Sequence, residues 1–479
     1  MEKIYGDLPK RLRNMKGVGN IVELDLCRWI SLEDGLTIDD ISYAMQRALE
    51  SDEFSHLLKR NKGFHAIIHS TGALVVRNWL RNHSERPSPL RHLIHLAGAN
   101  FGSGLAHIGS GQLARWGREI FDGREAGIQV LRELEFGCGK TLDMHLQLMQ
   151  ADHHLFDAFK VREFCICGSQ VPKSMRNLPI RYVKEDASDC TVRTSASNTN
   201  LRYFTVVPQS SAYRLSHDEV RNKFRRRQTG RSLGSLDYMI AEKSIPGAAG
   251  RPRTPFGIPF QTTHIGKKTG IVFGSDSWQY VEPFLKAALG TSETNMDDYE
   301  NTAAKFAAWT QETEKKASSL GDEIKRSLLE WYPRRQYEAH AQLIFRLRDQ
   351  EGRSIEHFDI FLKSVRTSGK RVSIEKCIET RHINRFDKGT ITYYLRTKEF
   401  KDGVFMDRLD DLADLNLEIS AYEPGTKDII YLPVAVHISG GDLRQFIEHH
   451  HTTLVDVTML RIPSPNVFHI TRDTRTKPD

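Results

Sequence analysis

The sequence predicts an α/β domain with a mostly parallel sheet flanked by helices, followed by a β-sandwich-like domain. Strand-like and helix-like segments alternate over the first half of the chain, which is typical of a parallel sheet. In the last third, short alternating or β-branched runs follow one another without intervening helices, which favours a sandwich. We therefore expect an α/β domain over residues 1–290, a helical linker over 291–335 and a β-rich accessory domain over 336–479.

The elements of the first part follow from hydrophobic periodicity and capping signals. A helix is expected after Thr37, which is followed by two acidic residues, and another over residues 71–82. Residues 100–157 are Gly-rich and irregular and residues 214–253 are polar and basic, so both are interpreted as insertions. Short apolar runs predict buried strands at residues 18–26, 63–69, 90–97, 161–168 and 180–183.

The second part begins after a charged helical pattern over residues 297–331, which Pro333 terminates. Gly, Asp and Pro turns separate the strand-like runs that follow. These runs cover residues 339–348, 358–365, 390–397, 415–422, 429–438 and 452–462.

Composition excludes several classes of protein. With 479 residues, of which 39% are hydrophobic, the chain can build packed cores, so wholesale disorder is excluded. No run approaches the roughly 18 apolar residues of a membrane-spanning helix. Residues 1–13 are charged and lack the apolar centre of a secretory signal. We therefore expect a cytoplasmic protein, with signal-independent export as the alternative.

The charge balance is mild. Lys and Arg number 68 and Asp and Glu 61, a net charge of +7. No finger, homeodomain or RNA-recognition pattern appears, so nucleic acid is not an expected partner. The basic residues within 221–231 are interpreted as a solvated loop, with peripheral contact to anionic phospholipid headgroups as the alternative.

No motif predicts a cofactor or a metal. Residues 137–141 (G-C-G-K-T) resemble the end of a phosphate-binding loop but lack its first glycine. The run His449, His450, His451 cannot present three ligands on one face of a strand or helix. The six cysteines are sparse and are expected to be reduced core residues.

The most informative string is A-I-I-H-S-T-G-A-L-V, residues 66–75. A buried strand leads into Ser70 and a helix departs at once, which is the geometry of a nucleophile elbow. Gly72 is expected to let the helix pack closely past this turn. The Thr71 N–H at the helix start can bind a developing oxyanion. A serine that only caps the helix is the alternative, and His69 is interpreted as a packing or hydrogen-bonding neighbour.

A nucleophilic serine needs a base and an orienting acid. In hydrolases with a nucleophile elbow, the acid follows the serine in the sequence and the base follows the acid. Asp189 and His264 are the candidates, with Asp186 and His217 in reserve. The alternatives are that Asp189 only caps a turn and that His264 is a surface or capping residue.

Four strings, H-S-T-G-A-L-V-V-R, L-A-G-A-N-F-G-S, S-D-C-T-V-R and T-H-I-G, resemble α/β-hydrolases of the bacterial serine lipase and phospholipase-like group. The resemblance covers roughly residues 5–290. It implies that Asp189 is the acid, that His264 is the base, and that a loop shapes the mouth of the site. The residues of that loop are Asn100, Phe101, Gly102 and Ser103.

Three features depart from the family pattern. Ile68 and Cys190 stand where glycine is usual, and the opening strand with its second oxyanion donor is absent. Losing one such donor costs on the order of 10²–10³ in rate. A shortened N-terminus, a replacement donor and a loss of catalysis are the competing explanations, and we favour the first.

The sequence thus predicts a serine ester hydrolase that acts on lipid or phospholipid acyl esters. In this hypothesis Ser70 attacks, His264 transfers the proton and Asp189 orients the imidazole, without a cofactor or metal. Residues 100–157 are a candidate lid or acyl pocket. A catalytically impaired scaffold that binds lipid or protein is one alternative, and an acyltransferase on the same triad is another. The protein partner of the C-terminal domain is not predicted.

Overall fold

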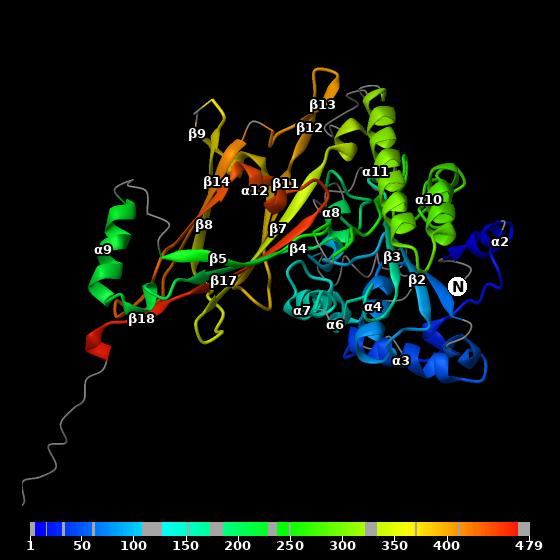
Figure 1. The fold of residues 1–479 in the computed structure, drawn as a ribbon, viewed down its shortest axis with the longest axis horizontal. Coiled ribbons are helices and arrows are strands. Elements are labelled where there is room, and N and C mark those ends of the chain that lie inside the picture. The colour runs from blue at the N-terminus through cyan, green and yellow to red at the C-terminus, as the bar shows by residue number, and fades with distance from the viewer. Residues whose placement is uncertain are drawn as a thin grey trace, which may run out of the picture.

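A computed structural model provides the structure of the chain. It describes all residues except 1–4, 16, 31–33, 60–62, 108–126, 151, 153, 173–184, 229–236, 249–250, 321–332, 369–370, 411 and 468–479. Figure 1 shows an α/β part, which contains the N-terminal helices, and a β-rich part that extends away from it.

The α/β part is built on a parallel sheet, as predicted. Its strands lie in the order β1 (Phe64–His69), β2 (Leu90–Leu96), β3 (Arg162–Ile166) and β6 (Phe256–Gly257), and every pairing is parallel. Parallel strands place their carboxyl ends at one edge of the sheet, so the loops that leave β1 and β6 meet there.

Helices cover both faces of this sheet (Figure 1). Helices α3 (Ile38–Glu50) and α4 (Gly72–Asn82) share one hydrophobic core with Leu93 of β2. Helices α10 (Trp278–Gly290) and α11 (Met296–Ser318) share the other core with Ile94 and Leu96. Neighbouring residues of β2 thus enter opposite cores, which is why the strand reads as a continuous apolar run. The capping box predicted at Thr37 is present, with Asp40 as its partner.

The β-rich part consists mainly of two facing sheets, which confirms the predicted fold class. One six-stranded sheet has the order β10-β11-β7-β17-β4-β5, and a four-stranded antiparallel sheet has the order β16-β14-β8-β9. One hydrophobic core fills the space between them. The strands are β7 (His340–Asp349), β8 (Phe358–Arg366), β9 (Arg371–Ser373), β10 (Ile378–Ile383), β11 (Thr390–Arg396), β14 (Leu412–Ala421), β16 (Val434–Ser439) and β17 (Thr452–Met459).

Two strands of the large sheet come from the middle of the chain. Strands β4 (Arg202–Pro208) and β5 (Tyr238–Ser244) lie within the range expected in the α/β domain, and β4 pairs with β17. The reason is the strict alternation of β4, which places Phe204 and Val206 in the core of the sandwich. The pairing of β4 with β17 crosses the expected boundary at residue 335. The division of the chain into domains there stays a prediction.

Residues 18–26 form no strand, so that prediction is wrong. The segment is irregular up to a short 3-10 turn at Leu26–Arg28. Its residues Val18 and Ile21 pack against the core that contains α10. The strand expected at 180–183 lies outside the described residues.

The remaining elements are short. Hairpin β12 (Lys398–Lys401) and β13 (Val404–Asp407) and the pair β15 (Ile429–Tyr431) and β18 (Arg461–Pro463) flank the sandwich. The remaining helices are α2 (Leu8–Arg13), α6 (Ile128–Glu133), α7 (Gly139–Gln147), α8 (Thr194–Ser197), α9 (His217–Gln228) and α12 (Gly440–Phe446). Within the described part of the chain, none of the helices has the length and apolar content needed to cross a bilayer.

Candidate active site

Ser70 occupies a sharp turn between β1 and α4. Its φ is 55°, in the left-handed region that residues other than glycine rarely adopt. The Ser70 N–H donates to Leu96 O at 3.2 Å, and the Ser70 carbonyl accepts from Ala99 N–H at 3.2 Å. These bonds anchor the turn to the end of β2. A strained residue held by its surroundings is typical of a functional position.

Ser70, His264 and Asp189 form a continuous hydrogen-bonded path. His264 Nε2 lies 3.0 Å from Ser70 Oγ, and His264 Nδ1 lies 2.8 Å from Asp189 Oδ2. The side chains of His264 and Asp189 are fully buried. Asp189 Oδ1 accepts from the N–H groups of Thr191 at 3.0 Å and Val192 at 2.8 Å, so both carboxylate oxygens have partners. This arrangement can remove a proton from the serine hydroxyl.

A backbone hydrogen bond also joins Asp189 and His264. The His264 N–H donates to Asp189 O at 3.1 Å, so the two loops are joined at the main chain. His264 follows β6, and Thr263 forms an isolated bridge with Gly270. His264 therefore lies on a short loop that the Thr263–Gly270 bridge closes.

The role of Thr71 as an oxyanion donor stays a prediction, and its backbone N–H is available for it. Thr71 is the N-cap residue of α4, and no group among the described residues accepts a hydrogen bond from its N–H. Its hydroxyl is buried and lacks a hydrogen-bond partner in the described structure. Among the described residues, no backbone N–H other than that of Thr71 is assigned to this role, and the second donor stays a prediction.

His69 lies beside His264. Its Nε2–H donates to the carbonyl of His264 at 3.2 Å, and the two ring centroids are 4.5 Å apart. Burial and the neighbouring His264 hold the pKa of His69 well below its usual value. These are contacts of hydrogen bonding and ring packing, and the role of His69 in the site stays a prediction.

Gly72 does not have the packing role that the sequence suggested. A Cβ at this position would meet only Ile68 Cβ, at an ordinary 3.5 Å. The close approach is at Gly98 instead, where a Cβ would lie 2.9 Å from both Ala73 Cβ and His95 Nδ1. The helix therefore packs past the loop after β2 at Gly98.

The loop of Asn100, Phe101, Gly102 and Ser103 is buried and contacts the segment that follows Asp189. Asn100 Nδ2 donates to Ser197 O at 2.8 Å, and Ser103 Oγ donates to Thr191 O at 2.7 Å. Phe101 N–H donates to Ala196 O at 2.9 Å. Gly102 has a φ of 102°, and a Cβ there would lie 2.8 Å from the Phe136 ring. The loop therefore packs against residues 191–197, and its role at a site mouth stays a prediction.

The reserve residues lie away from this path. The Asp186 carboxylate accepts from Gln336 Nε2 at 3.0 Å and lies 3.6 Å from Arg396, and burial raises its pKa. His217 begins α9, which Figure 1 places at the far end of the β-rich part. Residues 221–228 of the basic run belong to helix α9, so the prediction of a loop is wrong for them, and residues 229–231 lie outside the described residues.

The three consecutive histidines have separate partners. His449 Nε2 lies 3.0 Å from Asp407 Oδ2, His450 Nδ1 lies 2.9 Å from Thr194 Oγ1, and His451 Nδ1 lies 2.6 Å from His449 O. No group of metal ligands is found among the residues that the structure describes.

Sequence reasoning missed a buried ionic network beneath the elbow. Glu163 of β3 is in close contact with Arg77 of α4, and His95 Nε2 of β2 lies 2.9 Å from Glu163 Oε1. Burial alone would raise the pKa of Glu163, but Arg77 and His95 hold it far below its usual range. The signal that could have found it is the presence of charged and imidazole side chains inside two buried-strand patterns.

Of the comparisons with known proteins, the one with solved structures shows the fold. No family model matches the chain, and no curated protein matches it significantly. Phospholipase PlaB from Legionella pneumophila, in complex with thio-NAD, superposes with a TM-score of 0.75 at 22% identity, covering 100% of this chain and 95% of PlaB. A second PlaB structure gives a TM-score of 0.74 with the same identity and coverage. The chain therefore has an α/β-hydrolase fold with a C-terminal β-rich part, as does this phospholipase.

Proposed function

We propose that this protein is a serine hydrolase that cleaves carboxylic esters through Ser70, His264 and Asp189. The observation that carries the proposal is the unbroken path of 3.0 Å and 2.8 Å contacts from Ser70 Oγ through His264 to Asp189. The left-handed φ of Ser70 supports it, because elbow serines of this fold adopt such a strained turn.

The reaction follows from the positions of these groups. Ser70 Oγ attacks the ester carbonyl carbon while His264 Nε2 takes its proton. The carbonyl oxygen becomes an oxyanion, to which the Thr71 N–H donates. As the intermediate collapses, the C–O bond breaks and His264 gives the proton to the departing alcohol. Water then attacks the acyl-serine by the same route. Asp189 orients the imidazole and stabilises the imidazolium throughout.

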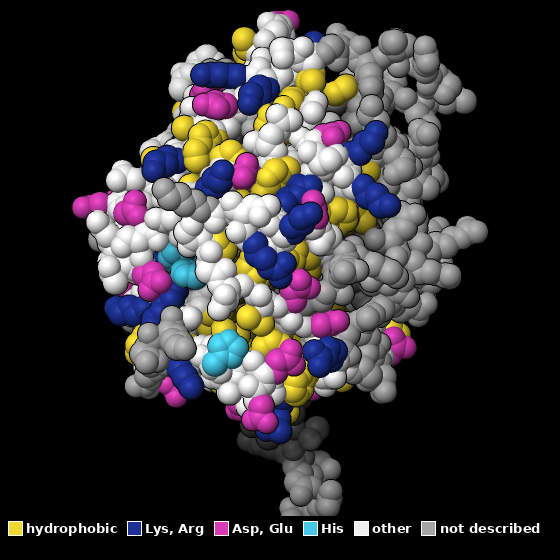
Figure 2. Space-filling model, turned by 90° about the vertical axis from the view of Figure 1, so that its right-hand side faces the viewer, with side chains coloured by type: hydrophobic (Ala, Val, Ile, Leu, Met, Phe, Trp, Pro, Cys, Tyr) yellow, Lys and Arg dark blue, Asp and Glu magenta, His cyan; other side chains and the backbone are white. Residues whose placement is uncertain are grey.

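For the substrate we propose the acyl ester of a lipid, and specifically of a phospholipid. The support is the overall likeness to a phospholipase, which extends over both parts of the chain. A strongly cationic surface is not part of this proposal. On the face shown in Figure 2, acidic and basic side chains are interspersed over the described residues, with hydrophobic side chains between them.

The test is labelling by a fluorophosphonate, which reacts with activated serines. Wild type should be labelled and Ser70→Ala should not. Ser439→Ala is the matched control, because Ser439 also stands in a Ser-x-Gly string and its hydroxyl donates to Asp442 Oδ2 at 2.9 Å. Labelling that persists in Ser70→Ala would refute the assignment of the nucleophile.

A second measurement addresses the substrate. Wild type should release fatty acid from phosphatidylcholine or phosphatidylglycerol vesicles, and Ser70→Ala should not. Labelling without release from any phospholipid would leave a serine esterase of another substrate class. A folded wild type that shows neither would favour the catalytically impaired scaffold.

A further inference from the structure

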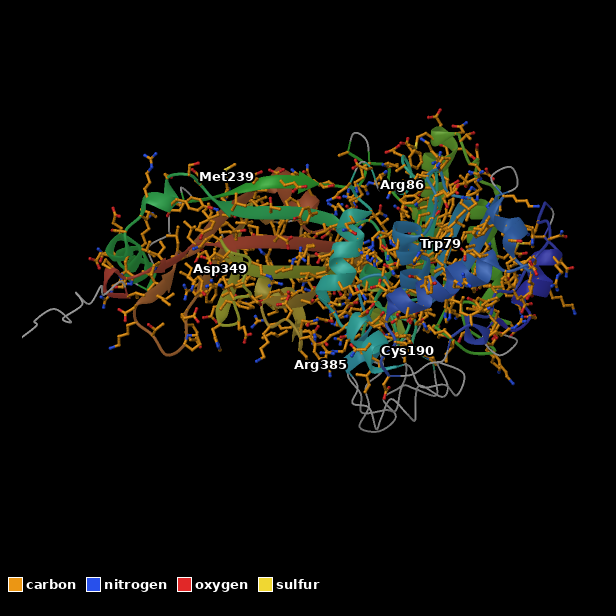
Figure 3. All side chains as sticks on the ribbon, turned by 90° about the horizontal axis from the view of Figure 1, so that it is seen from below. Trp79, Arg86, Cys190, Met239, Asp349 and Arg385 are labelled. Atoms are coloured by element: carbon orange, nitrogen blue, oxygen red, sulfur yellow. The ribbon has the colours of Figure 1, made fainter. Side chains whose placement is uncertain are left out.

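We infer that Tyr394, on the large sheet of the β-rich part, is a positioning residue for Asp189. The inference rests on the proposed function, because it assigns the β-rich part a role in that same site. The segment of residues 185–193, which carries Asp189, is called the acid loop below. It lies where the two parts meet, and Figure 3 marks its residue Cys190 near this junction.

The acid loop is strained and needs external support. Ala187 has a φ of 51° and Cys190 a φ of 82°, so two of its residues are in the left-handed region. Within the loop, Asp189 N–H donates to Val192 O at 3.2 Å. Such conformations cost on the order of 1–3 kcal/mol each and persist only where neighbouring groups hold them.

Tyr394 contacts both ends of this loop. Its hydroxyl donates to Asp186 O at 2.7 Å and approaches Ala187 O at 3.3 Å, which holds the entry of the loop. Its ring lies 4.1 Å from the guanidinium of Arg193, which ends the loop. Tyr394 is completely buried, so water cannot replace these contacts.

Arg193 ties the same loop further into the large sheet. Its side chain is buried and makes two bonds to Glu185, at 2.7 and 2.8 Å. The guanidinium also donates to Gln342 Oε1 at 3.2 Å and to Thr380 Oγ1 at 3.1 Å. Strands β7, β10 and β11 therefore all contribute to the position of the acid loop.

The consequence concerns the acid of the proposed triad. Asp189 stands between the two ends that Tyr394 contacts, and its Oδ2 must point at His264 Nδ1 across 2.8 Å. A small rotation of the loop lengthens that contact without touching Ser70 or Thr71. Loss of the Tyr394 hydroxyl should therefore weaken transition-state stabilisation and leave substrate binding unchanged.

The strand offers a matched control. Tyr393 precedes Tyr394 on β11 and points to the opposite face, into the core of the sandwich beside Phe345. Tyr394→Phe and Tyr393→Phe each remove one hydroxyl from adjacent, buried positions of one strand. Only the first removes a contact to the acid loop.

The first experiment is a double-mutant cycle on a soluble ester substrate. Tyr394→Phe should lower kcat about tenfold with KM unchanged, and Tyr393→Phe should leave both unchanged. In the Asp189→Asn background, Tyr394→Phe should change kcat by less than about twofold, because its effect acts through Asp189. An equal loss in both backgrounds, or no loss in either, would overturn the inference.

The second experiment does not depend on turnover. In histidine-labelled full-length protein, the NMR resonance of the proton between His264 Nδ1 and Asp189 is identified by its absence in Asp189→Asn. Tyr394→Phe should shift or broaden this resonance, whereas Tyr393→Phe should not. A protein that fails to hydrolyse esters but shows this shift would refute the proposed function alone. An unchanged resonance in Tyr394→Phe would refute the positioning role alone.

Discussion

Replacing Asp189 with asparagine removes the charge of the acid and keeps its shape. The asparagine carbonyl oxygen can take the place of Oδ1, which accepts from the N–H groups of Thr191 at 3.0 Å and Val192 at 2.8 Å. The amide nitrogen then faces His264 Nδ1. Because an amide N–H can only donate there, His264 Nδ1 must be unprotonated, and Nε2 must carry the proton. In that tautomer the imidazole cannot accept the proton of Ser70.

The expected loss of kcat follows from this change of the His264 tautomer. In serine hydrolases with the same geometry, the exchange of acid for amide lowers kcat on the order of 10⁴-fold. This corresponds to about 5.4 kcal/mol of transition-state stabilisation at ~1.36 kcal/mol per factor of ten. Stability should change little, since the two backbone hydrogen bonds to Asp189 are retained.

The assay is steady-state hydrolysis of a soluble ester by purified wild type, Asp189→Asn and Asp186→Asn. Asp186 is the matched control, because it is three residues away and its carboxylate contacts Gln336 and Arg396 instead of His264. It should lose less than about tenfold in kcat. Thermal unfolding of all three proteins separates misfolding from loss of catalysis.

One pattern of results would refute the reasoning. If Asp189→Asn retained more than a tenth of the wild-type kcat while Asp186→Asn lost most of it, Asp186 would be the acid. The hydrogen-bonded path through Asp189 would then be a structural feature only.

Four further predictions concern stability. In a denaturant titration, Gly102→Ala should lower the free energy of unfolding by about 2–3 kcal/mol, since φ is 102° and an aromatic ring lies 2.8 Å from the new Cβ. Gly72→Ala is the control and should leave the free energy of unfolding unchanged or raise it by up to ~1 kcal/mol. Glu163→Gln should cost about 3–5 kcal/mol, because it leaves buried Arg77 without its counter-charge. Burial raises the pKa of Glu163, but Arg77 and His95 lower it more, so the pKa in the fold lies below the usual 4.5. The ionised carboxylate therefore stabilises the fold above that pH, and this stabilisation is lost on acidification. Thermal unfolding between pH 7 and 3 measures the loss, and a flat profile would contradict the prediction. The fragment 336–479 should show no cooperative unfolding by circular dichroism, because it lacks β4, which pairs with β17 inside the large sheet.

Local sequence patterns were sufficient to predict the fold class and the turn at Ser70. The strand before Ser70 and the helix after it are adjacent in sequence, so periodicity alone predicts both. The alternating runs of the last third likewise predict the strands of the sandwich, because side-chain alternation reports a buried face wherever the partner strand comes from. The choice of Asp189 and His264 needed more than periodicity, since Asp186 and His217 fit the same order. The resemblance to lipases favoured the pair that the structure brings into contact with Ser70.

Pairing between distant segments was decided only in the tertiary structure. Residues 18–26 have the composition of a strand but form none, while β4 and β5 leave the range of the α/β domain to join the large sheet. The hydroxyl of Tyr394 meets the acid loop from 207 and 208 residues away. The tight packing past the elbow falls on Gly98 instead of Gly72 for the same reason. A sequence reports which faces must be buried, because burial depends on each residue's own chemistry. It does not report which segments cover those faces, because that depends on the packing of the whole chain.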